Sequence, residues 1–132
     1  MNEYEIVMRQ DFAWPDAFAA RETVEGESAL AVAKSAAETV GENVVVEVVL
    51  DDEIAATAAG GYVRGAGYVV SVTKDGRVLQ EDLYESRIEA MEKYDAMALN
   101  PSCSMVLARV TLDENGDYDC LGEIVSLRNG QA

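Results

Sequence analysis

The chain has 132 residues and a mass of 14.2 kDa, enough for one domain or two very small ones. It carries 25 acidic against 10 basic residues, a net charge of −15, and such a field repels phosphate backbones and anionic lipids. We therefore expect no direct binding to nucleic acid or to a membrane surface. The absence of histidine excludes catalytic and metal sites that depend on imidazole.

The N-terminus and the cysteines favour a cytoplasmic protein. The first residues have neither the basic nor the apolar region of a signal peptide, and the longest apolar run is too short for a membrane helix. A hairpin turning at Asn115-Gly116 would not make Cys103 and Cys120 cross-strand neighbours. We expect both thiols to be reduced and unpaired.

The first half of the chain predicts three strands and a helix. Residues 3–9 alternate in polarity as a strand does, and residues 19–24 form a second short strand. Apolar residues recur at steps of three and four over 27–40, which predicts a helix that stops at Gly41. Residues 44–50 are apolar on both faces, as expected of a central strand or of one covered by another subunit.

A stretch rich in alanine and glycine covers residues 55–67, and within it Gly60-Gly61 and Gly65-Ala66-Gly67 are expected to form a flexible joint between the two copies. Beyond it, residues 68–74 and 77–83 are rich in β-forming side chains. The Asp75-Gly76 dipeptide between them is typical of a two-residue hairpin turn, because such turns need positive φ.

The last part of the chain repeats the pattern of helix followed by strands. A capping box beginning at Ser86 predicts a helix that ends near residue 98. Residues 104–112 and 118–127 are expected to be strands joined by a tight turn over 113–117. The second half thus has the same predicted element order as the first.

Residues 45–53 align with residues 106–114, which indicates an internal duplication. We predict an α+β fold of two tandem ββαββ-like units, residues 1–65 and 66–132, in one compact body. Each unit would have a mainly antiparallel sheet with one helix, and the first would carry an aromatic insertion at 11–18. The predicted core comprises Ile6, Met8, Leu30, Ala33, Ala37, Val46, Val48, Val70, Val72, Ile88, Met91, Leu107 and Val110.

The insertion contains the single tryptophan and both phenylalanines of the chain, at Phe12, Trp14 and Phe18. One interpretation is a docking loop for a partner protein, because binding hot spots favour tryptophan. The other is a hydrophobic plug that covers the open end of the first sheet. Under the second interpretation, Trp14→Ala would cost roughly 3–5 kcal/mol of stability.

Two acidic clusters fall at the same place in each predicted copy: Asp51, Asp52 and Glu53 in the first, Asp113 and Glu114 in the second. An acidic face of this kind would attract a basic partner protein by long-range electrostatics, including a protein that normally binds nucleic acid. The simpler interpretation is solvation by surplus carboxylates.

The leading hypothesis is a non-enzymatic acidic protein-binding module, with an inhibitor that mimics nucleic-acid charge as its narrower form. The alternative is a small-ligand or metal-binding domain that uses the seam between the two units. Oxygen ligands at Asp113, Asn115, Asp117 and Asp119 resemble half of a calcium loop, but Gly116 is misplaced for one. No phosphate-binding or nucleophile motif is present, so we expect no cofactor. An enzyme would have to work through Asp, Glu, Tyr or Cys alone.

Overall fold

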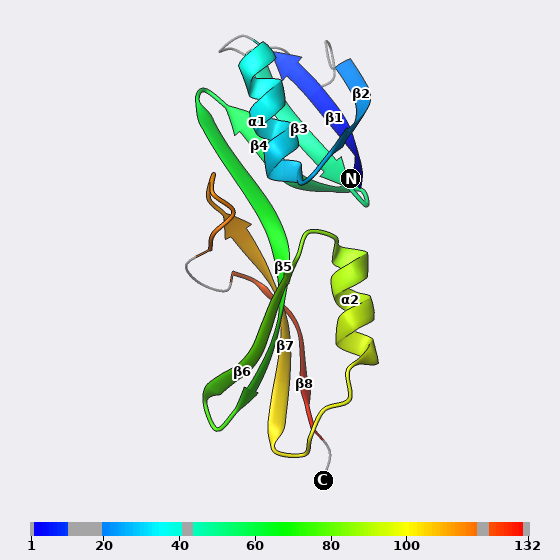
Figure 1. The fold of residues 1–132 in the computed structure, drawn as a ribbon, viewed down its shortest axis with the longest axis vertical. Helices are drawn as coiled ribbons and strands as arrows, with labels where there is room; N and C mark the ends of the chain where they lie inside the picture. Colours follow the sequence, from blue (N-terminus) through cyan, green and yellow to red (C-terminus); the bar gives the residue numbers. More distant parts are fainter. Residues whose placement is uncertain (1, 11–19, 41–43, 119–121, 131–132) are drawn as a thin grey trace. The chain divides into compact units, whose positions relative to one another are not determined.

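The computed structural model describes residues 2–10, 20–40, 44–118 and 122–130, which form an α+β fold with eight antiparallel strands in one sheet and two helices (Figure 1). By contacts the chain divides into two compact units. Unit 1 comprises Met1–Ala66 and Leu112–Asp117, and unit 2 comprises Gly67–Thr111 and Tyr118–Ala132. The elements are β1 (Asn2–Gln10), β2 (Ala20–Gly26), α1 (Ala29–Thr39), β3 (Val44–Leu50), β4 (Glu53–Ala59), β5 (Tyr62–Lys74), β6 (Arg77–Tyr84), α2 (Arg87–Ala96), β7 (Cys103–Leu112) and β8 (Ile124–Asn129).

In unit 1 the strands run in the order β2-β1-β3-β4, followed by the first residues of β5, and α1 packs on one face. The register sets Ile6 between Glu22 of β2 and Val48 of β3. The valines of β3 divide between the two faces as a central strand requires: Val46 and Val48 are fully buried beneath α1, while Val45 and Val49 are half-buried on the other face.

Small side chains bring α1 close to this sheet. Its buried residues are Ala29, Val32 and Ala33, and the N-cap Ser28 accepts a hydrogen bond from the amide of Ala31 at 3.1 Å. Alanine loses no side-chain entropy in a helix, so the sequence favours both the helix and a short distance to the strands.

In unit 2 the strand order is β6-β5-β7-β8, and α2 covers one face. The predicted core was wrong for this helix: Ile88 is 55% and Met91 38% exposed, whereas Ala90 and Tyr94 are buried against the sheet. The face is selected by Tyr94, whose hydroxyl accepts a hydrogen bond from Ser126 of β8 at 3.1 Å. The helix therefore buries an alanine and an amphipathic aromatic in place of its aliphatic residues.

The glycines expected to form a flexible joint lie in a turn and a strand, and the division between the two units falls after Ala66, within β5. Gly60 and Gly61 both have positive φ, 55° and 88°, and form the turn between β4 and β5. Gly65 lies inside β5, where an added Cβ would come within 2.9 Å of the Leu30 side chain. Here glycine allows the strand to pass under the helix.

The last strand is shorter than predicted and begins later, at Ile124. The register between β7 and β8 shifts between Leu107 and Ala108, which marks a bulge. Gly122 donates a backbone hydrogen bond to the Arg109 carbonyl at 2.9 Å. Of the hairpin expected around Asn115-Gly116, the described residues include the turn, closed by the Asp113 amide and the Asp117 carbonyl at 2.9 Å, and the pairing of Arg109 with Gly122 and Glu123.

Candidate functional site

Acidic charge is concentrated in unit 1. This unit holds sixteen of the 25 acidic residues but only four of the ten basic ones. Three of these sixteen carboxylates come from the turn at 112–117, which belongs to unit 1 although it lies far from the rest of that unit in the sequence. A basic molecule would therefore meet the strongest attraction on this unit.

The first predicted cluster forms the turn between β3 and β4. Asp51 and Asp52 both adopt positive φ, 54° and 64°, as a two-residue hairpin turn of the primed type requires. Both are exposed, and Glu53, the first residue of β4, is half-buried. Aspartate tolerates this backbone conformation better than most residues. The same two residues therefore form the turn and place negative charge on the surface.

In the second predicted cluster, the Asp113 side chain forms hydrogen bonds within its own turn. One carboxylate oxygen of Asp113 accepts hydrogen bonds from the amides of Asn115, at 2.8 Å, and Asp117, at 3.0 Å. The fourth residue of the calcium pattern, Asp119, lies outside the described residues. Among the described residues, no group of three or more Cys, Asp or Glu side chains is placed to hold a metal ion.

The two clusters lie at opposite ends of unit 1. Glu114 lines a hollow together with the Gly60-Gly61 turn at the end of β4, whereas Asp51 and Asp52 precede the start of that strand. A strand of seven residues spans roughly 20 Å. The structure therefore brings both clusters into one unit but does not join them into one patch.

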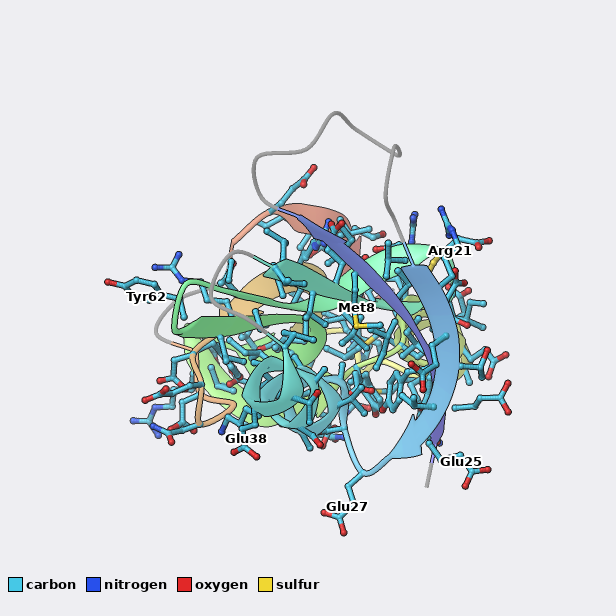
Figure 2. The ribbon with its side chains drawn as sticks, turned by 90° about the horizontal axis from the view of Figure 1, so that it is seen from above. Met8, Arg21, Glu25, Glu27, Glu38 and Tyr62 are labelled. Atoms are coloured by element: carbon cyan, nitrogen blue, oxygen red, sulfur yellow. The ribbon has the colours of Figure 1, made fainter. Side chains whose placement is uncertain are left out.

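Two hollows of similar size flank α1, one on each side. The β4 hollow, of about 360 Å³, lies between the C-terminal half of α1 and the β4–β5 turn. The β2 hollow, of about 350 Å³, lies between α1 and the strands β1 and β2. In Figure 2, Met8 of the β2 hollow points inward, whereas Glu25, Glu27 and Glu38 point outward. Because the buried face of α1 is built from two alanines and one valine, the helix fills only the middle of the sheet.

The linings of the hollows combine an apolar floor with a charged rim. The β4 hollow is lined by Lys34, Ala37, Glu38, Val40, Val44, Ala58, Ala59, Gly60, Gly61, Tyr62, Val63 and Glu114. The β2 hollow is lined by Ile6, Met8, Glu22, Val24, Glu25, Val32, Ser35, Ala36 and Thr39. Pockets of this kind, apolar with few polar groups, suit amphipathic ligands or side chains.

The perturbed titratable groups lie in unit 2 and indicate structural roles. Burial, a hydrogen bond to Glu81 and the charge of that carboxylate raise the pKa of Tyr118 to about 12. Burial, and then the charges of Asp82 and Glu89, raise the pKa of Tyr84. Both phenols are therefore neutral at physiological pH. Cys103 is a free thiol buried in the core of unit 2, where an apolar environment makes a cysteine unreactive.

The aromatic candidates Phe12, Trp14 and Phe18 lie outside the described residues. The sequence reasoning missed both hollows, whose walls come from segments far apart in the chain. The sequence feature that could have indicated the hollows is the excess of alanine in residues 29–37. A helix with such small side chains leaves part of the adjacent sheet uncovered.

Within the described part of the chain, no helix is long and apolar enough to cross a membrane. Comparisons with protein-family models, with curated proteins and with solved structures found no match to this chain.

Proposed function

We propose that the protein is a non-enzymatic binding module whose unit 1 recognises a basic protein surface. The observation that carries the proposal is the placement of sixteen of the 25 carboxylates in this unit, against four basic residues. Complementary charge of this kind accelerates encounter and fixes orientation more than it adds affinity. Apolar hollows beside the charged rims would supply the short-range contacts that charge alone lacks.

Affinity capture from a lysate of the source organism at low and at moderate ionic strength tests this proposal. The bait is the full chain, compared with a variant carrying Asp51→Asn, Asp52→Asn and Glu53→Gln. Asparagine keeps the positive-φ turn accessible, so this variant loses charge without losing the hairpin.

A matched control removes the same charge from unit 2. It carries Glu92→Gln, Asp95→Asn and Glu123→Gln, all at exposed positions. We expect a partner whose recovery falls with salt and falls further with the unit 1 variant than with the control. Equal loss with both variants, or recovery that does not change with salt, would refute recognition through unit 1.

The narrower form of the proposal is a protein that occupies a phosphate-binding groove on its partner. It predicts that duplex or single-stranded DNA competes with the protein for the captured partner. A partner that binds both at once would exclude charge mimicry and leave the wider proposal intact.

A second candidate function is small-ligand binding, favoured by the presence of two hollows of about 350 and 360 Å³ in one small unit. We locate this candidate in unit 1, not at the seam considered from the sequence. A ligand that binds only the folded state raises the melting temperature. A thermal-shift panel of metabolites and divalent ions, calcium included, without any shift would argue against it.

We also propose that the chain arose by duplication of a ββαββ unit. Two observations support this: the strand orders β2-β1-β3-β4 and β6-β5-β7-β8 correspond element by element, and each helix begins after a serine cap, Ser28 or Ser86. Under this proposal unit 1 acquired the acidic surface after the copies diverged.

A further inference from the structure

The two hollows beside α1 differ in charge although their sizes and floors are alike. Glu38 and Glu114 line the β4 hollow together with Lys34. Glu22 and Glu25 line the β2 hollow, and none of the described residues that line it is basic. A cation that enters the β2 hollow therefore meets acidic side chains without a basic residue in the same lining.

The register places one of these carboxylates directly beside the apolar floor. Glu22 lies opposite Ile6, whose side chain is buried under α1, so Glu22 stands on the same face of the sheet. Arg21, the preceding residue, pairs with Glu5 at 2.8 Å on the other face. That pairing keeps this guanidinium on the opposite face from Glu22.

The floor of the β2 hollow is apolar and is formed by residues of three elements. It combines Ile6 and Met8 of β1, Val24 of β2, and Val32 and Ala36 of α1. Lysine and arginine bury their methylene stems on apolar surface while their charged ends stay near water. An apolar floor with the Glu22 carboxylate at its edge is complementary to both parts of such a side chain.

We propose that the β2 hollow receives a single lysine or arginine side chain of the basic partner. The stem lies on the floor of the hollow, and the cation meets Glu22 at the rim, while Glu25 at the edge of the hollow points outward (Figure 2) and adds only to the local negative field. This inference rests on the proposed function and names the contact through which unit 1 recognises its partner. The β4 hollow, with Lys34 in its lining, is not the preferred site.

Titration of the full chain with N-acetyl-arginine amide, followed by methyl NMR, tests the proposal. We expect the shifts to be largest at the methyl groups of Met8, Val24 and Val32, and small at those of Val40 and Val63 in the β4 hollow. N-acetyl-norleucine amide, which keeps an aliphatic stem but has no charge, should bind more weakly.

Two double variants with the same change in net charge provide the matched comparison. Glu22→Gln with Glu25→Gln should weaken binding of the probe roughly fivefold, since the exposed ion pair with Glu22 and the nearby charge of Glu25 are lost. Glu38→Gln with Glu114→Gln should weaken it less than about twofold. All four positions are exposed, so both variants are expected to fold.

Equal weakening by the two double variants would overturn the proposal, because it would indicate a diffuse field and not a site. So would shifts centred on the β4 hollow, or no shift at any methyl group. If the Glu22→Gln, Glu25→Gln variant captures the salt-sensitive partner as well as the wild type does, the β2 hollow is not the contact site. The proposed function would then still stand. If no such partner exists, the proposed function itself fails.

Discussion

Arg128 holds the C-terminal end of α2 on the sheet of unit 2, and its replacement by methionine should destabilise the protein. The guanidinium donates hydrogen bonds to the carbonyl oxygens of Tyr94, at 3.0 Å, and of Met97. It also lies over the ring of Tyr94, with 5.3 Å between the Arg128 Cζ and the ring centroid. One side chain thus satisfies carbonyls that the end of a helix leaves without partners.

The expected loss follows from these contacts. Hydrogen bonds from a charged donor contribute about 1.5–3 kcal/mol each when buried, and about 1 kcal/mol each is reasonable for the half-exposed Arg128. The cation–π contact adds about 0.5–1 kcal/mol. We expect Arg128→Met to lower the free energy of unfolding by about 2–3 kcal/mol, since methionine keeps the apolar stem but donates nothing.

Urea unfolding of the full chain, followed by circular dichroism, measures this loss. Arg128→Lys should fall between wild type and Arg128→Met, because lysine keeps the charge but not the planar fork that reaches two carbonyls. Arg77→Met, at an exposed position of β6, should change stability by less than about 0.5 kcal/mol. A similarly small effect of Arg128→Met would refute the assignment of Arg128 as the anchor of α2.

Three further predictions concern caps, a phenol and the aromatic segment. Ser28→Ala and Ser86→Ala should each cost about 1 kcal/mol in urea unfolding, since each removes the acceptor at a helix N-terminus, and Ser→Gly should cost less. The folded state holds the Tyr118 proton to about pH 12 and the unfolded state to about pH 10, so stability present below pH 10 is lost as the pH rises toward 12. Unfolding curves of Tyr118→Phe should show a smaller alkaline loss, because Tyr84, whose pKa is also raised, still contributes to it. A loss identical to that of the wild type would show that Tyr118 does not cause it. Trp14→Ala separates the two roles of its segment: a loss of about 3–5 kcal/mol identifies a plug, whereas unchanged stability with lost partner binding identifies a docking loop.

Features encoded within a few residues could be predicted from the sequence. The strand at 44–50 was confirmed residue for residue. The Asp75-Gly76 turn has positive φ at both residues, and Ser86 caps α2 through the Glu89 amide as the capping box predicts. In each case the determining contacts lie within one turn or one alternation of the chain, so a local pattern is sufficient.

Features that depend on distant partners were missed. Periodicity assigned Ile88 and Met91 to the core, but the buried face of α2 is set by Tyr94 and its partners on β8, more than thirty residues away. Gly65 was taken for part of a joint because its requirement, a close approach by the Leu30 side chain, comes from another element. The hollows have the same cause, since their walls join α1 to strands on both sides.

The path of the chain gives the two units an interleaved order with a practical consequence. Unit 1 is interrupted after residue 66 and resumes at residues 112–117, while β5 supplies its first residues to one unit and the rest to the other. A single cut therefore cannot release either unit whole. A fragment that ends at residue 66 would lose three of the carboxylates that make unit 1 acidic, among them Glu114 in the wall of the β4 hollow. A substitution in the turn at 112–117 therefore alters unit 1, although this turn is encoded between two strands, β7 and β8, that belong largely to unit 2.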